Sequence, residues 1–258
     1  MLISGYPIWV VLIICAGVFC ASFVDSIGGG GGIISVPVYL LAGLPPHFAL
    51  GTNKLSSTLG TVVSTFRYVK NKYVDWALAA PAIVLALIGS WFGTRLQLMA
   101  DEKYLQYVLL GVLPVVAVVL LRKKSFPETR GEMNTAARYA VISAASLVFG
   151  TYDGFYGPGT GTFLLLVFCH LATMDVRSAS GNMKLVNLAS NIGALSTALM
   201  AGKVLVPIGV IAAAFSIAGH YIGAGLTIKN GTKIVRPVII VVLLLLAVKI
   251  ILEMLGIL

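Results

Sequence analysis

The sequence predicts an all-α fold, a polytopic transmembrane helical bundle built from two inverted five-segment repeats with broken or re-entrant helices. Three observations predict it. Of 258 residues, 59% are hydrophobic and 10% are charged, and the mean hydropathy is +0.99, a balance that the water-facing surface of a soluble domain does not allow. The apolar residues fall into ten segments, and the first five resemble the last five.

The ten apolar segments are long enough in total to cross a membrane many times. One crossing needs roughly 20 residues, so the chain supplies about eight to ten spans. The first segment has no basic region before it and no small-residue cleavage site after it, so we expect it to be retained as a span. The segments are 8–24, 33–44, 49–69, 75–97 and 103–121, then 136–152, 161–172, 179–200, 203–226 and 232–256.

The most polar stretch, 122–138, divides the chain into a first repeat at 1–121 and a second at 139–258. Asp25 and Asp153 are separated by 128 residues rather than 130, which indicates a two-residue insertion in the second half. Identical residues recur at a constant offset of 130: Ala49 and Ala179, Gly51 and Gly181, Lys54 and Lys184, Gly89 and Gly219, Gly93 and Gly223.

Basic residues in short loops predict the orientation of the spans, because cytoplasmic loops carry an excess of lysine and arginine. The same preference explains the net positive charge without a nucleic-acid partner. Counting spans places both termini outside the cytoplasm. Because each repeat has five crossings, the second repeat is upside down relative to the first, as in many secondary transporters. The basic loops placed inside carry Arg67, Lys70 and Lys72, then the 122–138 linker, then Lys229, Lys233 and Arg236.

Segments 33–44 and 161–172 are too short to cross alone. About 12 residues of helix extend roughly 18 Å, against a hydrocarbon core of about 30 Å. Each follows a glycine-rich break, so we expect half of a discontinuous helix or a re-entrant hairpin in each repeat. Short interrupted segments at matching positions of two repeats predict a binding site near the middle of the membrane.

The glycine breaks are the first candidate site. No Gly-Lys-Ser/Thr follows the first break, and it follows a membrane span rather than a strand, which argues against a nucleotide site. Exposed glycine N–H groups beside a helix N-terminus can hold an anion, whereas the alternative is that glycine only allows helices to pack closely. The candidate glycines are Gly28, Gly29, Gly30, Gly31 and Gly32, and in the second repeat Gly157, Gly159 and Gly161.

Lys54 and Lys184 lie inside membrane segments, where a central lysine costs about 2.5–3.5 kcal/mol. Polar residues at +3 and +7 share a helix face with each lysine. We interpret the two faces as polar stripes that offer cations and hydrogen-bond donors to an anion. In the alternative, the lysines reach the membrane interface and the polar groups join helices. The stripe residues are Asn53, Ser57 and Thr61, and Asn182, Asn187 and Asn191.

Two aspartates and a tyrosine lie beside the breaks. Asp25 and Asp153 can cap free amides or pair with a lysine, or they can exchange protons or bind a cation during transport. Tyr156 can donate its hydroxyl to a substrate or anchor the chain at the membrane interface.

Catalytic chemistry is not indicated. His47, His170 and His220 form no metal-ligand pattern, and we expect solvated surface roles for them. No serine stands in a nucleophile elbow. The sequence therefore predicts no enzyme activity, no metal and no cofactor.

The chain resembles the TauE/SafE family of sulfite exporter-like permeases. The residues that carry the resemblance are FVDSIGGGGGIISVPVYLLAGLPPHFALGTNKL in the first half, with YDGFYGPGTGTFLLL and KLVNLASNIGAL in the second. The resemblance implies a transporter in the bacterial inner membrane, acting mainly as an exporter of sulfur-containing anions such as sulfite, sulfoacetate or related organosulfonates.

The functional hypothesis is therefore export of a small anion through the lipid bilayer by alternating access. A dianion leaving through 100 mV, negative inside, gains about 4.6 kcal/mol. One alternative is a proton- or cation-coupled carrier that uses Asp25 and Asp153. Another is a membrane-embedded enzyme.

Overall fold

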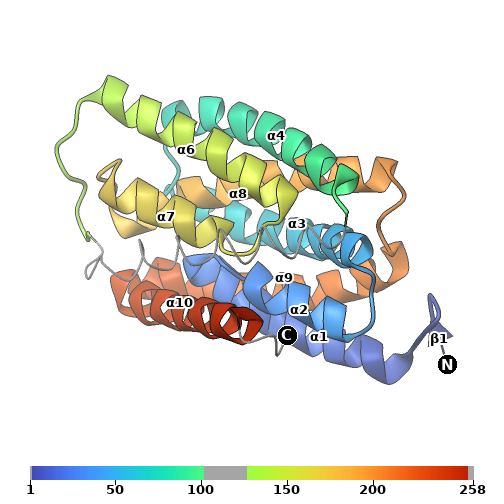
Figure 1. Ribbon diagram of the computed structural model, residues 1–258. Helices are drawn as coiled ribbons and strands as arrows, with labels where there is room; N and C mark the ends of the chain where they lie inside the picture. Colours follow the sequence, from blue (N-terminus) through green and yellow to red (C-terminus); the bar gives the residue numbers. More distant parts are fainter. Residues whose placement is uncertain (1, 102–126, 255–258) are drawn as a thin grey trace.

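The computed structural model describes residues 2–101 and 127–254 (Figure 1). The predicted segment at 103–121 and the start of the linker lie outside the described residues. A short antiparallel hairpin, β1 (Leu2–Ile3) with β2 (Tyr6–Pro7), precedes the helices. The described helices are α1 (Ile8–Gly28), α2 (Gly32–Leu41), α3 (Pro46–Lys70), α4 (Trp76–Met99), α6 (Thr135–Phe155), α7 (Thr160–His170), α8 (Val176–Met200), α9 (Val206–Asn230) and α10 (Thr232–Met254).

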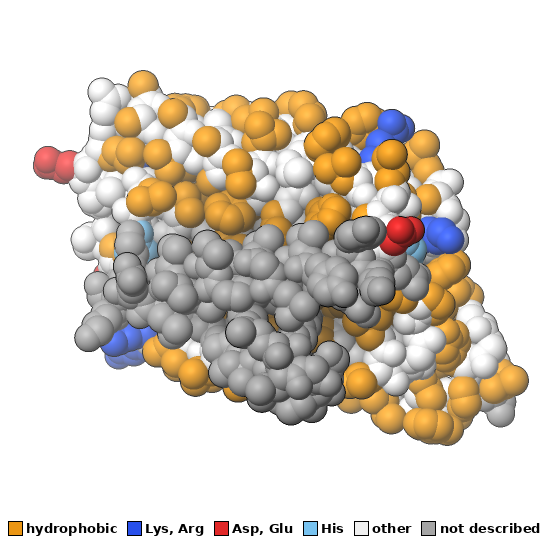
Figure 2. All heavy atoms as spheres, viewed as in Figure 1, with side chains coloured by type: hydrophobic (Ala, Val, Ile, Leu, Met, Phe, Trp, Pro, Cys, Tyr) orange, Lys and Arg blue, Asp and Glu red, His pale blue; other side chains and the backbone are white. Residues whose placement is uncertain are grey.

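The all-α membrane architecture is confirmed. By length and hydropathy, three of the described helices, α1, α4 and α9, can cross a membrane. On the described part of the face in Figure 2, apolar side chains are spread widely and charged side chains lie towards its ends. Large apolar residues such as Trp9, Phe66 and Ile88 are exposed, which suits a surface that faces lipid. The inverted relation of the two repeats stays a prediction.

Side chains next to the first turn cap the N-terminal ends of α6 and α8. Asn134 accepts a hydrogen bond from the N–H of Ala136 at 2.8 Å, and Asp175 accepts from the N–H groups of Arg177 and Ser178 at 3.1 and 3.0 Å. These side chains satisfy amides that have no partner within the first helical turn. The N-terminal ends of α6 and α8 are thus fixed by their sequence.

Two long polar helices, α3 and α8, form the centre of the bundle (Figure 1). Helix α1 packs against α9, and α4 packs against α6, while α3 contacts α9 and α8 contacts α4. Each central helix has 25 residues, about 37 Å of length. Neither is among the three apolar spans, because each buries a stripe of polar side chains inside the protein.

The short helices α2 and α7 follow the breaks, as predicted. They contain 10 and 11 residues, or roughly 15–17 Å of helix. The first break is shorter than the glycine tract, because α1 continues through Gly28 and α2 already includes Gly32. The non-helical backbone of the first break is therefore confined to residues 29–31, and two of its amides are already bonded: the Gly29 N–H donates to the Asp25 carbonyl at 2.9 Å and the Gly31 N–H to the Asp25 carboxylate at 3.1 Å.

The two breaks touch each other through their backbones. A Cβ atom on Gly161 would lie 2.8 Å from the Cα atom of Gly29, closer than non-bonded carbons approach. The Thr162 hydroxyl donates to the carbonyl of Gly28 at 3.0 Å. Gly29 has a φ of 75°, a conformation that glycine adopts without strain. Close packing and the turn both require glycine at this contact.

The predicted linker ends earlier than residue 138. Arg138, placed in the linker by its charge, lies in the first turn of α6 and is buried. Its guanidinium donates to the carbonyls of Ala172 and Gly131, each at 2.9 Å. Backbone carbonyls satisfy this cation, so Arg138 belongs to the start of α6. The division of the chain into two repeats joined by a cytoplasmic linker stays a prediction.

Candidate functional site

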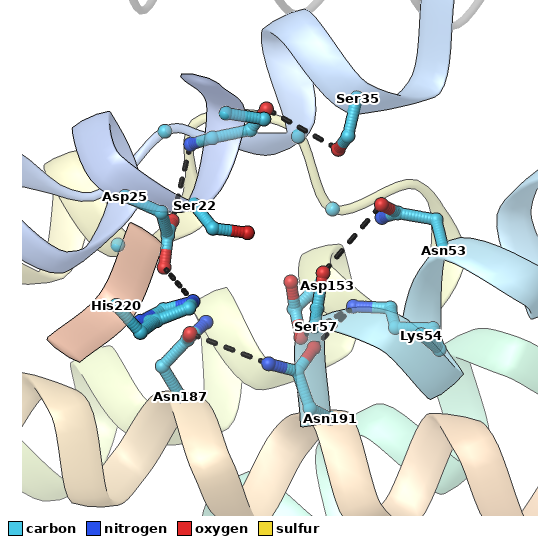
Figure 3. A pocket seen from close by; sticks show the side chains of 16 residues that line it. Ser22, Asp25, Ser35, Asn53, Lys54, Ser57, Asp153, Asn187, Asn191 and His220 are labelled. Carbon is cyan, nitrogen blue, oxygen red and sulfur yellow. Dashed lines mark hydrogen bonds and ion pairs between the residues drawn. The ribbon is translucent and has the colours of Figure 1, made fainter. Parts of the chain in front are cut away.

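A small polar cavity lies where the breaks face α3 and α8 (Figure 3). The volume open to the centre of a water molecule is ≈ 30 Å³, room for about two waters. Its wall includes Gly30, Gly31, Gly32, Gly157 and Gly161 of the two breaks. The polar and charged residues that line it are Ser22, Asp25, Ser35, Asn53, Lys54, Ser57, Asp153, Asn187, Asn191 and His220.

One ion pair joins Lys184 of α8 to Asp25 of α1. The Lys184 Nζ lies 2.6 Å from the Asp25 Oδ2 and also donates to the Asp25 backbone carbonyl at 2.6 Å. The Gly31 N–H donates to the Asp25 Oδ1 at 3.1 Å. Lys184 is fully buried, whereas 19% of the Asp25 side chain is exposed. Asp25 therefore pairs with a lysine and also satisfies an amide of the break.

A second ion pair joins Lys54 of α3 to Asp153 of α6. The Lys54 Nζ lies 2.7 Å from the Asp153 Oδ2, and both side chains are at least nine-tenths buried. Lys54 also donates to the Asn191 side-chain oxygen at 3.0 Å, and the Ser190 hydroxyl donates to Asp153 at 2.6 Å. Charge-assisted hydrogen bonds of this kind are strong in a low-dielectric interior.

The two pairs connect opposite halves of the chain in the same way. Each lysine pairs with the aspartate of the other half. The lysines thus do not extend to the membrane interface, and that alternative for them was wrong. Two positive and two negative charges cancel, and a buried charge needs such compensation.

Most residues of the two predicted polar stripes line the cavity. The amide of Asn191 donates to the Asn187 side-chain oxygen at 3.3 Å, and the Ser57 hydroxyl lies 3.5 Å from the Asn53 side-chain oxygen. Together with Lys54, these residues place an ammonium, amides and a hydroxyl around the cavity (Figure 3).

Other predicted residues lie outside the described cavity wall. Thr61 is fully buried, and its hydroxyl has no hydrogen-bond partner among the described residues. The Asn182 side-chain amide bonds within its own helix, α8, and donates to the carbonyl of Ser178 at 2.8 Å. Gly159 packs against the Phe163 ring. Gly28 and Gly29 shape the contact between the breaks.

Tyr156 borders a second, smaller cavity. This cavity also reaches Lys54, together with Gln97 of α4 and Ala198 of α8. The Gln97 amide and the His47 Nδ1 lie 2.6 Å apart, so His47 is a hydrogen-bonded residue beside this region. Because Lys54 borders both cavities, the Lys54–Asp153 pair lies between them.

His220 is the residue that sequence reasoning missed. The prediction of a solvated surface role was wrong, since His220 is buried and lines the central cavity. Its Nδ1 lies 3.0 Å from the Ser64 hydroxyl and its Nε2 lies 3.7 Å from the Asp25 Oδ2. The available signal was its position inside the apolar segment at 203–226, where a polar side chain needs a partner. Ser22 and Ser35 are further cavity residues without a sequence signal.

Among the described residues, no group of three or more histidine, cysteine or acidic side chains could hold a metal ion. The cavity wall offers the Lys54 ammonium, amides, hydroxyls and backbone N–H groups, which can bind an anion, together with the carboxylates of Asp25 and Asp153.

Comparison with known proteins identifies the family. Residues 13–250 match a family model described as sulfite exporter TauE/SafE. A probable membrane transporter protein of Sinorhizobium sp, ORF9, is 32% identical over 231 residues, which cover 90% of this chain and 88% of the relative. The probable membrane transporter protein YfcA of Escherichia coli K12 is 33% identical over 86% of this chain and 82% of its own.

A probable membrane transporter protein of Haemophilus influenzae is 30% identical over 89% of both chains. No solved structure matches the chain. The family match covers most of the sequence and both ion pairs, so the chain belongs to the sulfite exporter TauE/SafE family and is a membrane transporter.

Proposed function

We propose that this transporter moves small sulfur-containing anions, such as sulfite or organosulfonates including sulfoacetate, out of the bacterial cell across the inner membrane. One observation carries the proposal: the buried Lys54 lines a small polar cavity beside the two glycine breaks, and the buried Lys184 pairs with Asp25, which lines the same cavity. The family description, sulfite exporter, supports the choice of sulfur-containing anions.

The cavity can bind an anion through several kinds of donor. The Lys54 ammonium borders it directly, and the amides of Asn53, Asn187 and Asn191 surround the same space. Charged hydrogen bonds contribute about 1.5–3 kcal/mol each. A small oxyanion has several oxygens and can accept from more than one of these donors at once.

Alternating access would open the cavity to each side in turn. The Lys54–Asp153 pair lies between the central cavity and the smaller cavity beside Gln97, so breaking this pair would join them. In the proposed orientation, with both termini in the periplasm, the two inverted repeats would provide two equivalent states. Export of a dianion is favoured by about 4.6 kcal/mol at 100 mV, so efflux needs no coupling ion.

Flux measurements in liposomes test the proposal. We would compare uptake of sulfite, sulfoacetate and sulfate by the wild type, Lys54→Ala and Lys184→Ala, with the exposed Lys70→Ala as a matched control. Loss of one charged hydrogen bond predicts about a 10- to 100-fold lower rate in the two buried variants. Normal elution of each variant from a sizing column would show that it is folded. Unchanged anion flux in both would remove the lysines from the site.

Cation flux measured in the same liposomes separates the competing functions. A cation carrier that uses Asp25 and Asp153 would move cations but not these anions, and it would lose cation flux in Asp25→Asn and Asp153→Asn. The names of the relatives indicate transport rather than catalysis. Chemical turnover of a substrate without its translocation would favour a membrane-embedded enzyme instead.

A further inference from the structure

The Asp25 carboxylate occupies a place built for an anion. Groups from three parts of the fold surround it: the Lys184 ammonium donates to it at 2.6 Å, the Gly31 N–H donates at 3.1 Å, and the His220 Nε2 lies 3.7 Å away. Lys184 is fully buried, whereas Asp25 is partly exposed and lines the cavity. Asp25 lines the cavity (Figure 3) and Lys184 does not, so the carboxylate separates the lysine from the space where a substrate would bind.

The other aspartate has different surroundings. Asp153 is only 4% exposed and is held by Lys54 and the Ser190 hydroxyl. No histidine contacts it among the described residues, and the residue 130 positions before His220 is Ser90, whose hydroxyl donates to the carbonyl of Leu87. The two ion pairs thus share a geometry, but the Asp25 pair alone has an imidazole beside it in the described chain.

Charge balance limits what can enter the cavity. The two buried lysines and two aspartates cancel while His220 is neutral. An added anion would leave an uncompensated negative charge, which costs several kcal/mol in a poorly solvated interior. One proton bound at the same time would offset one negative charge, and it would also weaken the attraction between Asp25 and Lys184.

Asp25 and His220 are placed to hold such a proton together. The His220 Nδ1 is within hydrogen-bond distance of Ser64, whereas its Nε2 is 3.7 Å from Asp25, beyond a normal hydrogen bond. Among the described residues, Lys184 and Tyr68 of α3 lie near them, and the Tyr68 hydroxyl donates to the carbonyl of Ser26 at 3.2 Å. Lys54 and Asp153 line the same cavity. The described residues of α2, α7 and α10 place no ionisable side chain in contact with the carboxylate.

We propose that Asp25 is an internal anion that the substrate displaces, and that one proton binds with each substrate anion at Asp25 and His220. This inference rests on the proposed anion transport. The substrate oxyanion takes the place of the carboxylate at the Lys184 ammonium and the Gly31 N–H. The proton comes from solution, is held by the carboxylate and the imidazole, and leaves when the anion leaves. No covalent bond is formed or broken in the anion.

Proton uptake on anion binding tests the inference directly. The purified protein in weak buffer with a pH-indicating dye is titrated with sulfoacetate, sulfate or thiosulfate, none of which binds protons near neutral pH. We expect about one proton taken up per anion bound. We also expect anion affinity to fall by up to about tenfold for each unit of rising pH, in the range where Asp25 and His220 of the anion-free protein hold no proton.

Three substitutions locate the proton. Asp25→Asn imitates the protonated carboxyl, so it should bind anions without proton uptake and with little pH dependence. In Asp153→Asn, the ratio of protons to anions should stay near that of the wild type. His220→Gln should move the pH at which proton uptake occurs, since the proton would then be held by Asp25 alone.

The outcomes distinguish this inference from the proposed function. If the wild type binds none of the three anions and shows no flux in liposomes, the proposed function fails. If the wild type binds or transports an anion without taking up a proton, the proposed function stands and the role of Asp25 as a displaceable anion is wrong. The same conclusion follows if Asp25→Asn keeps the full pH dependence of the wild type.

Discussion

Replacing Gly161 by alanine would drive a methyl group between the two glycine breaks. The new Cβ atom would lie 2.8 Å from the Gly29 Cα, 3.5 Å from the Met183 Sδ and 3.6 Å from the Gly30 nitrogen. Carbon atoms in contact prefer about 3.5–4.0 Å, so the Gly29 backbone would have to move by roughly 1 Å. The neighbour is backbone, which cannot turn away as a flexible side chain can.

The expected cost follows from the geometry. Overpacking of this kind costs about 1–3 kcal/mol. Gly161 lies in helix α7 without a positive φ, so the better helix propensity of alanine returns up to about 1 kcal/mol. We expect a net loss of about 1–2 kcal/mol in the free energy of unfolding. For a chain of this size that lowers Tm by about 2–4 °C per kcal/mol.

Thermal unfolding in detergent measures the loss of stability, and anion flux in liposomes measures the loss of transport. Because the displaced break carries Gly31, we expect flux to fall together with Tm. Gly131→Ala is the control: its Cβ atom would meet only the Thr173 side chain, at 3.2 Å, and we expect a change within about 0.5 kcal/mol. A Gly161→Ala protein with wild-type Tm and wild-type flux would refute the reasoning that the breaks are held in direct contact.

Three further predictions concern hydrogen bonds away from the ion pairs, each measured as the change in the free energy of unfolding. Thr162→Val removes the donor to the Gly28 carbonyl at 3.0 Å and should cost about 1–3 kcal/mol; no loss would show that this bond does not stabilise the contact of the breaks. Asp175→Ala removes the cap of α8 and should cost about 1 kcal/mol, while Asp175→Asn should cost less. Arg138→Met leaves the Ala172 and Gly131 carbonyls without their donor and should cost about 2–4 kcal/mol, whereas a cost below about 0.5 kcal/mol would mean that water replaces the guanidinium.

Several elements of the fold follow from local sequence. The apolar segments predict the helices, and the glycine breaks predict the short helices α2 and α7. Local sequence does not predict where the first break begins and ends. Gly28 belongs to α1 and Gly32 to α2, and contact with the opposite break fixes the positions of these helices. Helix propensity is weak for glycine, and tertiary packing overrides it. Arg138 is a similar case, since carbonyls from another part of the chain decide whether it is buried.

The sequence by itself determined that the chain resides in a membrane, that it contains matching glycine breaks and that two lysines lie inside apolar segments. These features depend on composition and on spacing within one segment. The tertiary structure decided which aspartate meets which lysine and brought His220 to Asp25. Lys184 and Asp25 are 159 residues apart. Local periodicity carries no information across that distance, so the packing of α1 and α9 beside α3 and α8 sets the charge pattern of the cavity.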